Sequence, residues 1–224
     1  MKKFELTSEF ITNIFGTKLF RIKALIEFGN VKAGELGGFT EKEENLSQDG
    51  NAWVYDNARV YGDACVFGDA CVCGDARVHG NARVCGDACV YDNARVYGDA
   101  CVYDNARVYG DACVYGDARV CDNARVYGNA WVYGDACVCG DACVYGDACV
   151  YGDAGYATVH GFGSEYRTTT FFKTKAGDIG VKCGCFYGNL SEFRKKVVET
   201  HGETKKAKEY LMLADLMEFR LTHK

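Results

Sequence analysis

The sequence predicts an all-β solenoid of about six coils, placed between an N-terminal β cap and a C-terminal α+β module. Three observations carry this prediction. A six-residue pattern runs from Asn51 to Gly152 without interruption, as 17 hexads of Asp or Asn, Ala, any residue, Val, any residue, and Gly or Asp. Charge divides the 224-residue chain at the ends of this repeat, with net values of −1 over residues 1–50, −8 over 51–154 and +4 over 155–224. Hydrophobic residues make up 48% of the chain, which is typical of a packed protein and excludes a disordered one.

The hexad has the geometry of a strand followed by a turn. Ala and Val are separated by one residue, so both point into the interior, while the residues between and after them point outward. The Gly-Asp and Asp-Asn pairs that follow favour turns. A helix needs a period of about 3.6 residues, which six does not supply. Three hexads close one triangular coil, and coils about 4.8 Å apart give a column roughly 27 Å long.

The predicted domains are an N-terminal cap over residues 1–50, a β-helix over 51–154 and an α+β module with two helices over 155–224. Short strands are predicted over residues 2–6, 18–28 and 166–174. Asn189 and Glu192 have the spacing of a capping box, which predicts a helix that ends at His201-Gly202. A second helix is predicted over about residues 204–221, with an apolar stripe formed by Tyr210, Leu211, Ala214 and Met217. Both terminal segments are expected to cover the open strand edges of the solenoid.

Successive hexads belong to three faces in rotation, so residues 18 apart form surface columns. After Val, the first face carries Tyr55, Cys73, Tyr91, Tyr109, Tyr127 and Tyr145. The second face carries Tyr61, His79, Tyr97, Tyr115, Tyr133 and Tyr151. The third face carries Phe67, Cys85, Tyr103, Cys121 and Cys139. Two faces are therefore tyrosine ladders and the third is mostly thiol.

The second face is the candidate binding surface. Strand propensity and ring stacking between rungs explain its tyrosines, and a partner surface is compatible with both, since Tyr, Trp and Arg dominate interface hot spots. Arg beside Tyr also allows cation–π contacts. The candidate binding residues are Tyr61, Tyr97, Tyr115, Tyr133, Arg59, Arg77, Arg95 and Trp131. We expect a protein partner or a small ligand there.

Twelve of the 14 cysteines lie in the repeat, where other hexads have Arg or Tyr. Codons for Cys differ by one nucleotide from codons for Arg and Tyr, so drift within a repetitive gene explains their placement. Cys71 with Cys89, and Cys121 with Cys139, are 18 apart and lie within disulfide range. The sequence has no Cys-x-x-Cys pair, and the two thiols of a Cys-x-Cys pair point outward in parallel, so we expect reduced thiols, no metal and no cofactor.

Three further expectations concern the surroundings of the protein. The small thiols of the third face permit close approach, so we expect this face to pack against the C-terminal helical stripe or a second subunit. No run of 18 apolar residues occurs, which predicts no membrane-spanning helix. The N-terminus lacks an apolar signal segment, so we expect a cytoplasmic protein.

The Ala-x-Val hexad with small turn residues resembles the repeat of hexapeptide-repeat left-handed β-helix proteins, a family that includes trimeric acyltransferases and some carbonic anhydrases. Residues 32–39, Lys-Ala-Gly-Glu-Leu-Gly-Gly-Phe, and residues 45–58 resemble the N-terminal cap of phage and prophage hexapeptide-repeat proteins, some of them described as transferase-like. Residues 171–221 are similar to a module of phage-type proteins. The resemblance implies a left-handed coil, a homo-oligomer (trimer or dimer) and, for a phage protein, the host cytoplasm.

Acyltransferases of the resembled family place a catalytic histidine on a loop that projects from the coils, where it acts as a general base. Here 17 hexads run without an insertion, His79 occupies a ladder position, and only His160, after the repeat, is a better candidate. The carbonic anhydrase chemistry needs three histidines at a zinc ion, which the repeat does not contain. We therefore name no catalytic residue and predict a non-catalytic binding protein that acts on a host factor or sequesters a ligand.

Two alternatives stay open. The first is an acyltransferase-like enzyme. The second is an acidic mimic of nucleic acid, in which periodic aspartates imitate a row of phosphates, although turn chemistry explains these aspartates as well. Direct binding of nucleic acid by so acidic a solenoid is not expected.

Overall fold

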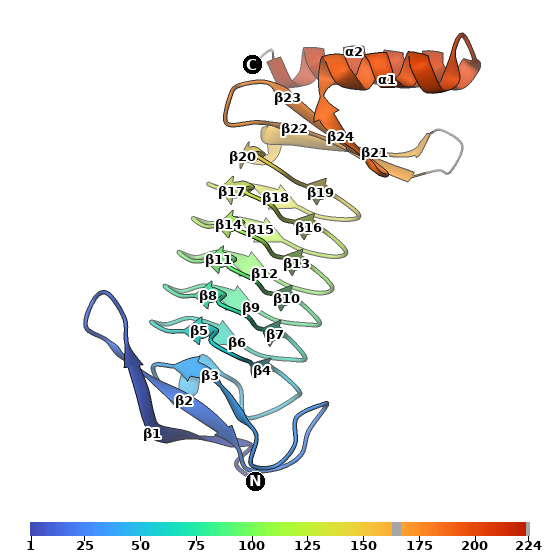
Figure 1. Ribbon diagram of the computed structural model, residues 1–224. Coiled ribbons are helices and arrows are strands. Elements are labelled where there is room, and N and C mark those ends of the chain that lie inside the picture. The colour runs from blue at the N-terminus through green and yellow to red at the C-terminus, as the bar shows by residue number, and fades with distance from the viewer. Residues whose placement is uncertain (163–166, 223–224) are drawn as a thin grey trace.

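The protein is a column of stacked coils with a different cap at each end. The computed structural model describes residues 1–162 and 167–222. Figure 1 shows the N-terminal strands at one end, the coils in the middle, and a sheet covered by two helices at the other end, so the two termini lie far apart. The predicted fold class, a parallel β-solenoid of about six coils with an N-terminal β cap and a C-terminal α+β module, is confirmed. The left hand of the coil stays a prediction.

Three parallel sheets form the faces of the column, and every third strand of the chain joins the same sheet. The first face consists of β4 (Trp53–Val54), β7 (Cys71–Val72), β10 (Cys89–Val90), β13 (Arg107–Val108), β16 (Arg125–Val126) and β19 (Cys143–Val144). The second consists of β5 (Arg59–Val60), β8 (Arg77–Val78), β11 (Arg95–Val96), β14 (Cys113–Val114), β17 (Trp131–Tyr133) and β20 (Cys149–Tyr151). The third consists of β6 (Cys65–Val66), β9 (Arg83–Val84), β12 (Cys101–Val102), β15 (Arg119–Val120) and β18 (Cys137–Val138).

Backbone hydrogen bonds join each coil to the next with a constant register. Arg95 pairs with Cys113, 18 residues later. The Arg95 N–H donates to Ala112 O at 2.9 Å, and the Tyr97 N–H donates to Val114 O at 3.0 Å. The predicted coil length is therefore confirmed within the repeat.

The interior of the column contains only small side chains. Every Ala and Val of the 17 hexads is buried, with at most 1% of its surface exposed. Two outward side chains, Trp53 and Cys121, are buried as well. The N-terminal cap covers Trp53, and the rings of Phe4 and Phe28 meet it edge-on at 6.1 and 5.3 Å.

Aspartates at the corners take part in turn chemistry. Asp92 adopts a φ of 59°, the left-handed region that Asn, Asp and Gly tolerate best. Its carboxylate accepts a hydrogen bond from the Gly110 N–H at 3.1 Å, one coil further on. The first residue of a hexad makes a similar contact: the Asn81 side chain donates to Oδ1 of Asp99, which lies one coil further on, at 2.8 Å. The carboxylates thus join neighbouring coils, which supports the turn interpretation of the acidic repeat.

The N-terminal cap consists of β1 (Phe4–Thr12), β2 (Lys18–Ala24), β3 (Leu36–Thr40) and a short 3-10 helix (Glu43–Asn45). Two of its strands correspond to predicted segments, and β3 was missed. β3 pairs with β5 in parallel, with Thr40 opposite Val60, and Leu46 forms a bridge to Val66. The coiling therefore begins before the first recognisable hexad.

Two buried side chains satisfy the open end of the solenoid at this cap. Lys3 is 2% exposed, and its ammonium donates to the carbonyls of Gly50 and Ala52 at 3.2 and 3.0 Å. Asn45 is fully buried, and its Nδ2 donates to Ala64 O at 2.8 Å. Burial lowers the pKa of Lys3 to about 8, although nearby aspartates oppose this shift. Unpaired carbonyls at the end of a sheet need such donors.

The C-terminal module is a four-stranded antiparallel sheet with two helices on one side (Figure 1). A 3-10 turn (Asp153–Gly155) leads into β21 (Tyr156–Phe162), β22 (Arg167–Lys173), β23 (Ile179–Cys183), β24 (Phe186–Asn189), α1 (Leu190–His201) and α2 (Lys205–Thr222). The predicted capping box is confirmed, because Asn189 accepts from the Glu192 N–H and Glu192 accepts from the Asn189 N–H. Residue 166 of the predicted strand lies outside the described residues. Neither helix, within the part of the chain described, is long and apolar enough to cross a membrane.

The expectation that the helical stripe covers the third face of the solenoid is wrong. Tyr210, Ala214 and Met217 are buried against Phe171 and Val181 of the module's own sheet. The helices therefore complete a second, separate core. The alternative, a second subunit on the third face, stays a prediction.

The narrow interior predicts a test of the inward assignment of Val. Val96→Phe should overpack the column and lower the free energy of unfolding by about 1–3 kcal/mol, measured by chemical denaturation. The control is Arg95→Phe, which adds the same ring on the outward side of the same strand. Equal stabilities of the two variants would show that Val96 does not point inward.

Candidate functional site

The second face brings the predicted aromatic residues into one stack. The rings of Tyr61, His79, Tyr97, Tyr115 and Tyr133 follow one another with centroid distances of 4.8–5.1 Å. Their interplanar angles are 1–10°, so the rings lie almost parallel. The spacing follows from the strand spacing of about 4.8 Å. Ring faces are therefore occupied by neighbouring rings, and the surface presents ring edges and hydroxyl groups.

These hydroxyl groups keep their protons at neutral pH. Burial raises the pKa of Tyr61, Tyr97 and Tyr115 above the ordinary value, although nearby arginines oppose the shift at Tyr61 and Tyr97. A protonated phenol both donates and accepts hydrogen bonds. The second face thus offers a regular row of neutral donors.

Arg59, Arg77 and Arg95 lie beside the N-terminal half of this stack, in three consecutive coils. Arg59 pairs with Arg77, and Arg77 pairs with Arg95, in the strand register. Within residues 1–162 and 167–222, no carboxylate forms an ion pair with any of these three guanidinium groups. Three like charges about one strand spacing apart repel one another, so this row lacks its counter-charge.

Trp131 lies on the same face but apart from the arginines. Cys113 separates it from Arg95 along the column. The Lys175 ammonium from the C-terminal module lies 3.9 Å from its ring centroid, a cation–π contact. The structure therefore brings seven of the eight candidate residues into one continuous surface and places Trp131 at its upper end.

The first face has a similar but less regular ladder. Tyr91, Tyr109 and Tyr127 stack with centroid distances of 4.7 Å, and Tyr145 is tilted by 32° against Tyr127. Only two arginines, Arg107 and Arg125, lie in consecutive rungs there. This face is a matched control for the second one.

The structure adds a third thiol to Cys121 and Cys139, which the sequence already places one coil apart. The sulfur atoms of Cys121, Cys137 and Cys139 on the third face all lie within 4.8 Å of one another. The sequence alone indicates only a parallel pair of thiols for Cys-x-Cys; here Cys121, in the preceding coil, lies beside both of them. In an 18-residue coil, cysteines that are 2, 16 and 18 residues apart lie next to one another, so this set of spacings is the sequence signal for such a cluster.

Cys71, Cys73 and Cys89 form a second group of thiols, on the first face and near the N-terminal end of the column. A hydrogen bond from Cys71 lowers the pKa of Cys89 to about 6, and a hydrogen bond from Cys71 also lowers the pKa of Cys73. The same two contacts raise the pKa of Cys71. This group is therefore a chain of thiols in which the central one stays protonated.

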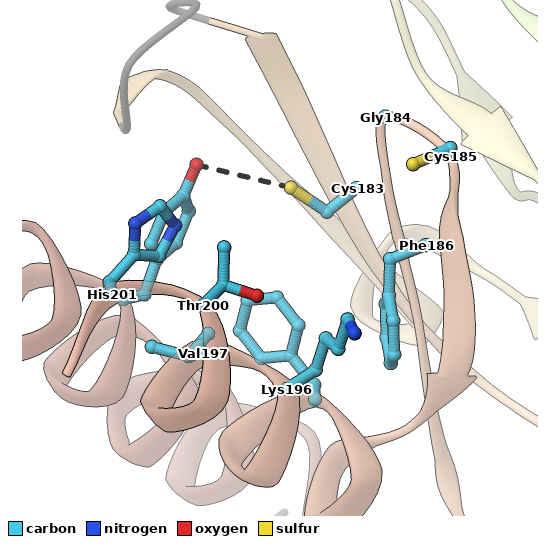
Figure 2. A pocket seen from close by; sticks show the side chains of 10 residues that line it. Cys183, Gly184, Cys185, Phe186, Lys196, Val197, Thr200 and His201 are labelled. Atoms are coloured by element: carbon cyan, nitrogen blue, oxygen red, sulfur yellow. Dashed lines mark hydrogen bonds between the residues drawn. The ribbon is translucent and has the colours of Figure 1, made fainter.

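A mostly apolar concavity lies in the C-terminal module (Figure 2). It has a volume of about 320 Å³ and is bordered by Cys185, Phe186, Lys196 and His201. The Cys183 sulfur lies 4.0 Å from the Tyr210 hydroxyl, and the dashed line that starts at Cys183 in Figure 2 marks this contact. None of the candidate residues on the second face reaches this pocket.

The two histidines considered as catalytic bases, His79 and His160, contact aromatic rings and a threonine, respectively. His79 is half-buried between two tyrosine rings. His160 is exposed on β21, where its Nδ1 bonds to Thr168 Oγ1 at 3.1 Å. A general base needs a substrate cleft as well as an orienting partner, and neither of these two rings lines the apolar concavity of the C-terminal module.

Comparison with known proteins agrees with the coil. The chain is similar to one family model, described as the YdcK beta solenoid repeat, over residues 52–68, 88–104, 100–116 and 118–134. All four segments lie within the coils. A search of curated proteins found no match. Together, the repeat match and the six-coil column support a repeat β-helix protein.

The stacked histidine predicts a pH dependence of stability. Burial lowers the pKa of His79 below its ordinary value of 6.5, and Arg77 and Arg95 lower it further. The unfolded chain then binds the proton more tightly than the folded one. Stability present at neutral pH should therefore be lost as the pH falls from about 6.5 through the lower folded pKa.

His79→Tyr should remove this part of the pH dependence, measured as the free energy of unfolding between about pH 7 and pH 5. Tyr97→Phe is the control, because it keeps both the stack and the imidazole, and its slope should match that of the parent. A parent-like slope in His79→Tyr would contradict the assignment.

Proposed function

We propose that the chain is a non-catalytic binding protein whose second face binds an acidic surface of a protein partner. One observation carries this proposal: three consecutive arginines without an internal counter-charge stand beside an unbroken stack of five aromatic rings. A charge row of this kind is stabilised by carboxylates from outside the chain.

The positive charge of the arginine row favours an acidic partner, although the coils as a whole are acidic. Residues 51–154 have a net charge of −8, so long-range attraction for an anion is weak. Contact at the arginine row is local, since salt screens charges beyond about 8–10 Å. Such a surface selects for a partner with acidic groups placed opposite these arginines and penalises general polyanion binding.

The rigidity of the ladder also suits binding. The stacked rings are held by a sheet in which every rung is hydrogen-bonded to its neighbours. A preorganised surface loses little conformational entropy when a partner docks. Tyr and Arg at fixed positions are the residue types that contribute most at interface centres.

The finer setting is also part of this proposal. The resemblance of the repeat and of both ends to phage hexapeptide-repeat proteins supports a phage or prophage protein that acts on a host factor in the host cytoplasm. The resembled family also supports a homo-oligomer. The uninterrupted hexads and the structural surroundings of His79 and His160 favour binding over acyl transfer.

Charge reversal on matched faces tests the proposal. Partners recovered from host extracts with the parent should fall at least tenfold in quantitative mass spectrometry with the triple variant Arg59→Glu, Arg77→Glu and Arg95→Glu. A tenfold loss corresponds to about 1.4 kcal/mol of binding free energy. The same partners should be retained by the control variant Arg107→Glu and Arg125→Glu on the first face.

Thermal unfolding of both variants shows whether they are folded. Alanine replacements at the same five positions give a second pair of variants, in which the charge is removed and not reversed. Equal recovery of the same partners by all variants would contradict binding through the second face.

A further inference from the structure

The thiols of Cys121, Cys137 and Cys139 converge at the upper end of the third face. Cys137 and Cys139 come from one coil, on either side of Val138, and Cys121 lies one coil below Cys139. Their three sulfur atoms lie within 4.8 Å of one another. Bonds of about 2.3 Å from sulfur to one zinc ion require sulfur atoms roughly 3.8 Å apart, so small side-chain rotations suffice to bring all three onto one ion.

The cluster is partly enclosed. Cys121 is 5% exposed, Cys137 is half-buried and Cys139 is exposed. Cys137 and Cys139 border a concavity of about 440 Å³ that is also lined by Tyr156, Met217 and Arg220. An ion would therefore enter from this concavity and bind over the buried sulfur.

A tyrosine from the C-terminal module positions two of the thiols. The Tyr156 hydroxyl donates to Cys137 O at 2.6 Å and accepts from the Cys139 N–H at 3.3 Å. It also lies 3.8 Å from the Cys139 sulfur. Such outer contacts orient metal ligands in proteins and tune their affinity.

We propose that Cys121, Cys137 and Cys139 bind one thiophilic d10 cation, Zn²⁺ or Cu⁺. Three thiolates are the soft donors that both ions prefer. Each coordinating thiol releases its proton to solvent as the metal–sulfur bond forms. Cu⁺ is satisfied by three sulfur atoms, whereas Zn²⁺ takes a water molecule from the concavity as its fourth ligand.

Metal titration of the reduced, metal-free full chain tests this site. Zn²⁺ in competition with a chromophoric chelator, and Cu⁺ in competition with a Cu⁺ chelator, should each report one tight equivalent, and the tighter arm identifies the preferred ion. Co²⁺ should give sulfur-to-metal charge-transfer absorption.

Matched serine variants locate the site. The triple variant Cys121→Ser, Cys137→Ser and Cys139→Ser should lose this equivalent and the charge-transfer band. The control variant Cys71→Ser, Cys73→Ser and Cys89→Ser removes the same number of thiols from the same kinds of position and should keep both. Tyr156→Phe should keep the band and weaken affinity by about tenfold or more.

Absence of a tight equivalent in the parent, or its full retention in the Cys121 triple variant, would overturn the proposal. Should that variant fail to fold, Cys139→Ser alone changes an exposed side chain and should still weaken the charge-transfer band. An unchanged band in folded Cys139→Ser would equally overturn it. These outcomes do not depend on the arginine row, so the metal site and the partner surface fail or stand separately.

Discussion

The ladder of backbone hydrogen bonds between coils, closed around an interior of alanine and valine, is the constraint on which the rest of the structure depends. The interior accepts only these small residues because three short strands face one another across a narrow column. Each coil must then contain 18 residues within the repeat, and each outward side chain must lie above the residue 18 positions earlier. The N-terminal cap serves the same constraint, since Lys3 and Asn45 supply donors to the carbonyls at that open end.

The surface chemistry follows from this register. Aromatic residues at equal positions become parallel stacks, arginines become charge rows, and cysteines 2, 16 and 18 apart become clusters. None of these groups is a motif in the linear sense, because the members come from different hexads. Repeated sequence therefore makes a rigid column, and the substitutions within each hexad decide what its faces bind.

The coils could be predicted from the sequence because period six, Ala-x-Val and the turn residues all indicate the same geometry. The start of the coiling could not, since Thr40 and Leu46 occupy ladder positions without the hexad pattern around them. The second-face surface was predicted from columns alone. The Cys121 cluster was predicted only in part, because Cys121 and Cys139 were placed one coil apart while the Cys137 and Cys139 pair was considered along its own strand alone. The apolar stripe of the second helix was expected to pack on the third face but packs on the sheet of its own module. Amphipathicity shows that a helix face is buried, but it does not show which partner buries it.

The register can be measured directly with the native cysteines as probes. The folded protein would be oxidised mildly, cleaved at its aspartates and analysed by mass spectrometry for disulfide-linked peptides. The structure predicts links within one column or cluster, above all Cys71 with Cys89 and Cys121 with Cys137 or Cys139. Dominant links between residues six apart on different faces, such as Cys65 with Cys71 or Cys137 with Cys143, would contradict the 18-residue coil.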